Sequence, residues 1–180
     1  MRVYSSIRQL AIAICLITGM MTVGSARAHS VNESQLKVAL IYNFILFTEW
    51  PASAIKDNKN LTICAKADSE LAASLMALEV RSIRNRQLRI QSLTEPADYT
   101  HCEVLYIDGS DRTRVSQIEK KLDRKSVLTI LSDEDFSSDG AIIALSLVNG
   151  RIVFDVNVTA AQNAQLVISS KLLRLARKVQ

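Results

Sequence analysis

Short apolar runs alternate with amphipathic segments along the middle of the chain, and this alternation constrains the fold more than any other feature. Runs typical of buried strands lie at 61–66, 86–93, 103–108 and 126–132. Amphipathic helical spacing is present at 69–80 and 112–122. Strands that alternate with crossover helices favour a largely parallel sheet with helices on both faces.

The C-terminal part of the chain follows a different pattern. Two apolar runs meet at Asn149-Gly150, a pair that two-residue hairpin turns favour because both turn positions need a positive φ. After the hairpin, Thr159 is the candidate N-cap of a helix, Val167-Ile168 indicates an extended link, and 169–178 predicts a final helix. We therefore predict a single-domain α/β fold with a mixed, mostly parallel sheet that ends in an antiparallel hairpin and a C-terminal helix.

The stretch ESQLKVALIYNFILFTEW, residues 33–50, contains no glycine or proline and predicts a helix. Asn32 is its candidate N-cap and Pro51 its candidate stop, because the residue before a proline is driven out of the helical region. The second half is apolar on almost every side, which indicates burial between other elements. We expect core positions for Tyr42, Phe44 and Phe47, and more exposed positions for Glu49 and Trp50.

The first 28 residues have the pattern of a secretory signal peptide. Arg2 and Arg8 precede an apolar run, and the segment ends in the small-residue motif Ala26-Arg27-Ala28. We expect cleavage after Ala28, with 29–180 as one periplasmic domain. The chain has 22 Lys and Arg against 18 Asp and Glu, and three of the arginines lie in the leader, so the mature net charge is about +1. That balance gives no indication of nucleic acid as a partner.

Two cysteines follow the predicted leader, Cys64 and Cys102. An even number of cysteines in an oxidising compartment favours a disulfide, and two buried free thiols are the alternative. Closing a loop of this length would stabilise the fold by about 4 kcal/mol in the chain-entropy model.

The usual catalytic motifs are missing from the sequence. It contains no G-x-S-x-G, P-loop or G-x-G-x-x-G pattern. His29 lies beside the cleavage point, and His101 with Cys102 provides too few ligands for a metal site. The acidic stretch 132–139 matches no calcium-binding loop and is interpreted as a solvated surface loop. We expect no enzyme, cofactor or metal, and a binding or regulatory function instead.

Two segments resemble the ends of the YfiR family: KVALIYNFILFTEWP at 37–51 and a second at 150–179. The marks of the second segment are Phe154, Val156, Asn157, Leu173, Leu175, Ala176 and Arg177. The resemblance implies a periplasmic protein that represses YfiN, an inner-membrane diguanylate cyclase, through its sensor domain, and that is sequestered by YfiB, an outer-membrane lipoprotein. Loss of repression would raise cyclic di-GMP and favour biofilm.

Characterised members of that family form homodimers and carry disulfides, one of which resembles Cys64 with Cys102. A second cysteine pair of the family is absent here, where its positions fall near Ser137 and Ala144. Redox control through that second pair is therefore not expected in this chain.

The C-terminal part also supplies the candidate partner surface, an apolar centre with a charged rim. We expect about half of its apolar members to be core, and a charge at an exposed one, such as Leu172, to release the partner without unfolding. The candidate residues are Phe154, Asn157, Leu166, Ile168, Leu172 and Leu173, with Arg174 and Arg177 as the rim. The alternative function is a periplasmic small-ligand sensor or solute-binding protein that serves another membrane receptor or sensor kinase, with its ligand at the carboxyl ends of the strands.

Overall fold

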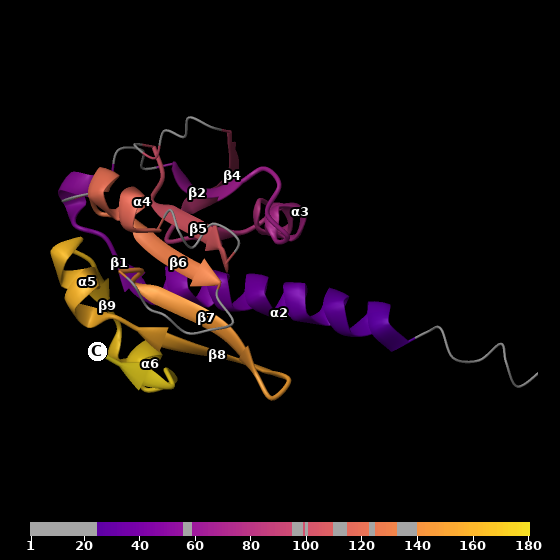
Figure 1. Cartoon of the computed structure of the whole chain (residues 1–180). Helices are drawn as coiled ribbons and strands as arrows, with labels where there is room; N and C mark the ends of the chain where they lie inside the picture. The colour runs from indigo at the N-terminus through magenta and orange to yellow at the C-terminus, as the bar shows by residue number, and fades with distance from the viewer. Residues whose placement is uncertain are drawn as a thin grey trace, which may run out of the picture. The chain divides into compact units, whose positions relative to one another are not determined.

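A computed structural model describes residues 25–55, 59–94, 99, 101–109, 115–122, 125–132 and 140–180 (Figure 1). The chain divides into residues 1–34, of which only the start of one helix is described, and the compact unit 35–180, which holds the sheet. In the described part of the chain, no helix has both the length and the apolar character needed to cross a membrane.

The strands and helices follow one another in nearly the predicted order. The strands are β1 (Thr48–Glu49), β2 (Asn60–Lys66), β3 (Ser82–Ile83), β4 (Arg86–Leu93), β5 (Val104–Asp108), β6 (Leu128–Ser132), β7 (Ile143–Val148), β8 (Arg151–Val156), β9 (Val167–Ile168) and β10 (Lys178–Val179). The helices are α2 (Ser25–Leu46), η1 (Ala52–Ala54), α3 (Ala72–Leu75), η2 (Met76–Leu78), α4 (Val115–Lys121), α5 (Val158–Asn163) and α6 (Ser170–Leu173).

Among the described residues, eight strands form one mixed sheet in the order β10-β8-β7-β6-β5-β2-β4-β3. The pairs from β4 through β2, β5 and β6 to β7 are parallel, while β3 with β4 and β7 with β8 are antiparallel. The turn of the second hairpin is Asn149-Gly150, with φ values of 51° and 73°. The mostly parallel sheet and the antiparallel hairpin at its end are therefore confirmed.

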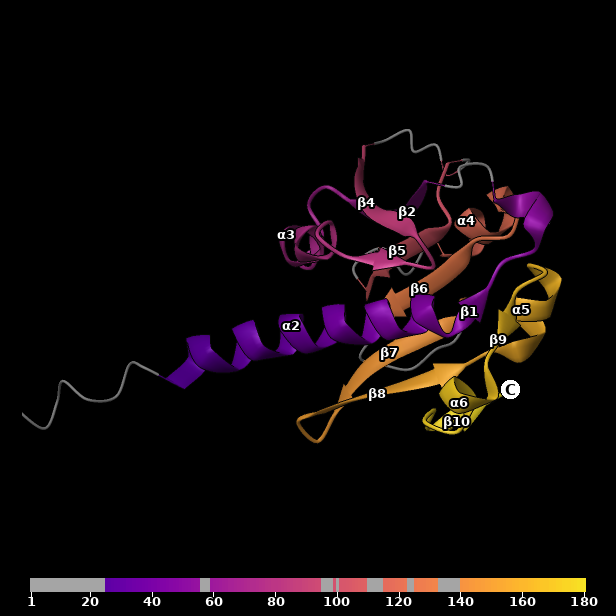
Figure 2. The ribbon, with the colours of Figure 1, turned by 180° about the vertical axis from the view of Figure 1, so that it is seen from behind.

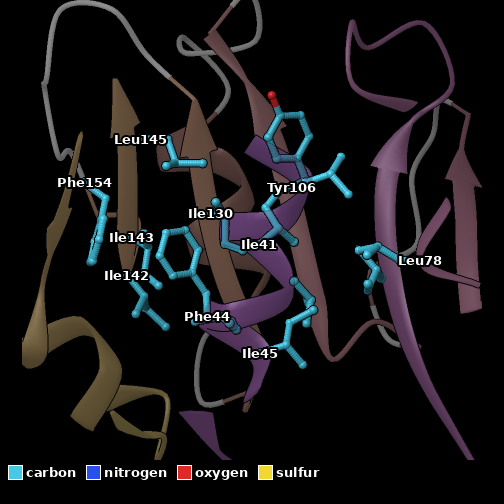
Figure 3. Packing of buried hydrophobic residues seen from close by; sticks show 14 of the residues in the cluster. Ile41, Phe44, Ile45, Leu78, Tyr106, Ile130, Ile142, Ile143, Leu145 and Phe154 are labelled. Atoms are coloured by element: carbon cyan, nitrogen blue, oxygen red, sulfur yellow. The ribbon is translucent and has the colours of Figure 1, made fainter. Parts of the chain in front are cut away.

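Helices cover both faces of the sheet because the central strands bury alternate side chains in two cores. In β5, Val104 and Tyr106 belong to the core beneath α2, called here the α2-side core. Leu105 and Ile107 point the other way and join Ile118 of α4 in the α4-side core. Figure 3 shows Ile41, Phe44 and Ile45 of α2 lying against side chains of the central strands.

The first helix differs from its prediction at both ends. It begins at Ser25, with no glycine or proline before Leu46 to interrupt it, so Asn32 is not its N-cap. It ends at Leu46 rather than at Trp50, because the Arg84 guanidinium donates to the carbonyl oxygens of Leu46 and Thr48 at 3.3 and 3.0 Å. The chain beyond this point pairs as β1 instead of continuing as a helix, and Pro51 follows that strand.

Two further predicted helices are shorter than their apolar patterns. The segment 69–80 contains only α3 and η2, because Leu88 N donates to Arg81 O at 3.0 Å and the chain turns into β3. The segment 169–178 contains only α6, because Arg177 N donates to Phe154 O at 2.8 Å and the chain then runs beside β8 as β10. The prediction of an extended link at Val167-Ile168 is confirmed by β9.

Two smaller predictions concern local features of the chain. Asn157, not Thr159, caps α5, since its side-chain oxygen accepts a hydrogen bond from Ala160 N at 2.8 Å. The acidic stretch after Ser132, residues 133–139, lies outside the described residues, so its interpretation as a surface loop stays a prediction.

The two cysteines form a disulfide rather than free thiols. Cys64 on β2 and Cys102 just before β5 have Cα atoms 5.7 Å apart and are bonded through sulfur. Both side chains are buried in the α4-side core. The bond therefore ties two neighbouring parallel strands together on the face that α4 covers.

Replacing both cysteines, in Cys64→Ser with Cys102→Ser, should lower the melting temperature by about 10 °C, because the unfolded chain regains the freedom that the bond removes. Calorimetry of the oxidised protein and the variant measures the difference. Dithiothreitol should bring the wild type close to the variant and leave the variant unchanged. Equal melting temperatures for the oxidised wild type and the variant would contradict a stabilising bond.

Candidate partner-binding surface

A buried carboxylate fastens the end of the chain to the sheet. Asp155 on β8 is only 3% exposed and accepts hydrogen bonds from Nε and Nη2 of Arg177, at 2.9 and 2.5 Å. This hydrogen bonding raises the pKa of Arg177, although partial burial opposes the shift. Next to the ion pair, Gln180 N donates to Val156 O and Val158 N donates to Gln180 O, at 3.0 and 2.7 Å. The last residues are therefore held in one place at the sheet edge.

A two-stranded ribbon joins the end of the first helix to the C-terminal segment. In this ribbon β1 runs antiparallel to β9, with Thr48 opposite Ile168 and Glu49 opposite Val167. Alternate strand residues point to opposite sides, so Thr48 and Ile168 are buried while Glu49 and Val167 are exposed. Beyond the ribbon, Ser169 N donates to the carbonyl oxygen of Phe47 at 2.9 Å. Figure 2 shows β9, α6 and β10 grouped near the C-terminus.

Most of the apolar residues predicted for the partner surface lie in the core. Phe154 packs on Phe44, with ring centroids 4.9 Å apart (Figure 3). Of the other predicted residues, Leu166, Ile168 and Leu172 also belong to the α2-side core, and Leu173 is partly buried against it. Leu172 is only 2% exposed, so the expectation that a charge at this position would spare the fold is wrong. A glutamate there would place a charge in an apolar core.

The remaining predicted residues are polar. Asn157 is half-buried and caps α5, as described above. Arg174 and Arg177 are exposed. Arg177 is occupied by Asp155, whereas no carboxylate of the described residues forms an ion pair with Arg174. Of the two arginines, Arg174 has its charge available for a partner.

Three exposed apolar side chains near the C-terminus are absent from the predicted set. The described part of the chain has seven large hydrophobic residues with high exposure, and three of them lie between residues 167 and 179. They are Val167 at 61%, Leu175 at 70% and Val179 at 47%. In one continuous helix Leu172 and Leu175 would share a face. Because α6 ends at Leu173, Leu172 is buried and Leu175 is exposed.

The charged side chains of the same segment are all basic. No Asp or Glu follows Asp155 in the sequence. Exposed cations therefore accompany the exposed apolar side chains of this segment. Glu49 of β1, which is exposed opposite Val167, is the acidic side chain beside it, and its carboxylate lies 3.9 Å from the Arg84 guanidinium. We call the resulting set the C-terminal surface: Val167, Lys171, Arg174, Leu175, Lys178 and Val179. Exposed apolar and cationic side chains on one segment fit a protein partner that offers apolar and acidic residues.

The aromatic side chains of the first predicted helix belong to the core or pack against it, and they do not form a binding surface. Phe44 is fully buried, and Tyr42, Phe47 and Trp50 are partly buried against the α2-side core. Trp50 is less exposed than predicted, and its indole N–H has no hydrogen-bond acceptor among the described residues. Glu49 is exposed, as predicted.

A family model described as YfiR/HmsC-like matches residues 34–177 of the 180. The matched stretch includes the disulfide, the ribbon of β1 with β9, and the Asp155–Arg177 pair. It also includes Val167 and Leu175 of the C-terminal surface and ends just before β10.

Removing the guanidinium, in Arg177→Ala, should leave the buried Asp155 carboxylate without this charged donor. We expect a melting temperature about 5 °C lower, and faster hydrogen exchange at the Gln180 amide, which bonds to β8. Thermal melts and exchange mass spectrometry measure the two effects.

The matched control is Arg174→Ala, which removes an exposed arginine that forms no ion pair among the described residues. It should leave both quantities unchanged. If Arg177→Ala behaves like this control, Arg177 does not fasten the C-terminus.

Proposed function

The chain belongs to the YfiR/HmsC-like family, and on that basis we propose that it is a periplasmic repressor of an inner-membrane diguanylate cyclase of the YfiN type. The family is periplasmic and regulatory rather than catalytic. A Cys64–Cys102 disulfide is the redox form that a periplasmic protein is expected to hold. By binding the sensor domain and holding the cyclase inactive, the protein lowers cyclic di-GMP and restrains biofilm formation.

The contact with the cyclase is made by the C-terminal surface. The observation that supports this is the concentration of Val167, Leu175 and Val179 as exposed apolar side chains on a segment that the Asp155–Arg177 pair holds in place. Covering a leucine that is 70% exposed removes apolar area from water, which contributes about 1–2 kcal/mol. A preorganised segment loses little conformational entropy on binding, so more of this contribution remains as affinity. The neighbouring cations steer an acidic partner surface toward it.

The remaining parts of the proposal concern processing and assembly. The leader is removed after Ala28, and residues 29–180 act as one domain. The mature protein forms a homodimer and is sequestered by an outer-membrane lipoprotein of the YfiB type, as the family resemblance implies. Loss of that sequestration would leave the cyclase repressed.

A charge at the most exposed apolar residue tests the surface. Leu175→Glu should weaken binding to the periplasmic sensor domain of the cognate cyclase by tenfold or more, because the carboxylate would be desolvated in the interface. The melting temperature should change little, since Leu175 is mostly in water. Titration calorimetry with each periplasmic sensor domain of the source bacterium's diguanylate cyclases measures affinity, and cyclic di-GMP in cells should rise with the variant.

Met76→Glu is the matched control, because Met76 is also exposed, at 50%, but lies in η2 rather than in the C-terminal segment. It should bind and repress like the wild type. A Leu175→Glu protein that melts normally and still represses would show that the contact lies elsewhere. If the wild type binds none of the sensor domains, the proposed function itself is wrong.

A further inference from the structure

A pocket away from the C-terminal surface has a lining that no part of the proposed repression uses. It lies where α4 ends, β6 and β7 begin, and α5 passes. Figure 1 labels these four elements. Its volume is about 370 Å³, within the range of sites for small organic molecules. The lining residues are Leu122, Lys125, Val127, Thr129, Gly140, Ile142, Asn157, Thr159, Ala160, Asn163 and Ala164.

One side of the pocket is apolar. Leu122, Val127 and Ile142 come from three different segments, and each is buried. Ala160 of α5 and Ala164, its C-cap, also line the pocket, and they are joined by the hydrogen bond from Ala164 N to Ala160 O. Small side chains at these two positions leave space that larger ones would fill.

Among the described residues that line the pocket, Lys125 is the charged one. Lys125 N donates to Leu122 O at 2.8 Å, and its carbonyl accepts from Val127 N at 2.9 Å, so hydrogen bonds fix its backbone on both sides. The side chain is half-buried. Within the part of the chain that the structure describes, no Asp or Glu lines the pocket and no carboxylate forms an ion pair with Lys125. A half-buried lysine without a counter-charge among the described residues favours an anionic ligand.

The neighbouring polar groups add hydrogen-bond donors. Asn157 uses its side-chain oxygen to accept from Ala160 N, which leaves the two N–H donors of its amide without a partner among the described residues. The Thr129 hydroxyl oxygen already accepts from Ile142 N at 2.9 Å. The exposed Thr159 hydroxyl can donate as well. A cation and donors beside an apolar wall match a carboxylate joined to a hydrocarbon body.

We propose that this pocket binds a small organic carboxylate with an apolar chain. The carboxylate contacts Lys125, and the chain packs on Leu122, Val127 and Ile142 opposite the two alanines of α5. The site is a property of the folded domain alone. It does not depend on which protein the C-terminal surface binds.

Three probes of equal chain length separate charge from hydrophobicity: hexanoate, 1-hexanol and hexylamine. Titration calorimetry at low ionic strength should detect hexanoate and show binding of the other two at least tenfold weaker. Lys125→Gln should lower the affinity for hexanoate by roughly tenfold to a hundredfold, which is the loss typical of a hydrogen bond to a charged group. Lys125→Glu should reverse the preference, so that hexylamine binds better than hexanoate.

Two further variants complete the test. Lys171→Gln removes an exposed lysine outside the pocket and should bind hexanoate like the wild type. Ala164→Leu should abolish binding by filling the space while keeping Lys125. Amide signals of Ala160, Ala164 and Ile142 should shift in NMR spectra when hexanoate is added.

Several results would overturn the site. Folded wild type that fails to bind millimolar hexanoate contradicts it directly. If hexanol binds as tightly as hexanoate, the pocket does not select anions. If Lys125→Gln binds hexanoate as tightly as the wild type, Lys125 does not contact the carboxylate. If a Lys125 variant unfolds, Ala164→Leu still tests the site. Unchanged hexanoate affinity in Ala164→Leu would show that the ligand binds elsewhere.

Discussion

The packing of α2 on one face of the parallel sheet is the contact on which the rest of the structure depends. The α2 side chains Ile41, Phe44 and Ile45 are fully buried against the sheet, and burying each of them contributes about 1.5–3 kcal/mol to the stability of the fold. Because Phe44 also touches Phe154, the same helix orients the last hairpin. The end of α2 then leads directly into the ribbon that carries Val167 on its outer side. The position of the proposed partner surface is therefore a consequence of how one helix is buried.

Polar clamps hold the sheet at both ends, where apolar packing alone would leave strands free to separate. At one end Arg86 contacts Glu103 at 2.7 Å, and Glu103 also accepts a hydrogen bond from Thr62 N at 2.8 Å. The Cys64–Cys102 bond lies beside this buried pair. At the other end Asp155 and Arg177 hold the C-terminus. Arg86 and Glu103 are both buried, whereas in the second pair Asp155 is buried and Arg177 is exposed. Separating either pair would leave a buried carboxylate without its charged partner, which disfavours other arrangements of the strands.

The helix α5 is shared by the two candidate sites. Its N-cap, Asn157, lines the pocket, and the chain leaving its C-terminal end enters β9. Ala161 of the same helix is buried in the α2-side core, while Ala160 and Ala164 pack against that core and also line the pocket. A single short helix thus connects the core, the pocket and the start of the C-terminal surface.

Local patterns in the sequence were sufficient to determine several features of this protein. The apolar runs predicted the strands, Asn149-Gly150 predicted the hairpin turn, and the spacing at 33–50 predicted that Phe44 lies in the core. Each of these depends on near neighbours in the chain, through side-chain periodicity or a positive φ.

Only the tertiary structure decided where the helices end and which apolar side chains stay in water. Arg84 ends α2 by hydrogen bonds to residues 36 and 38 positions away. The local sequence pattern favours a helix at Arg177, but its backbone N–H donates to the carbonyl oxygen of Phe154 instead. Leu172 and Leu175 are both leucines and would lie on one face of a continuous helix, yet Leu172 is buried and Leu175 is 70% exposed. Long-range hydrogen bonds override local helix propensity here, because burying an unpaired backbone group costs more than the propensity contributes.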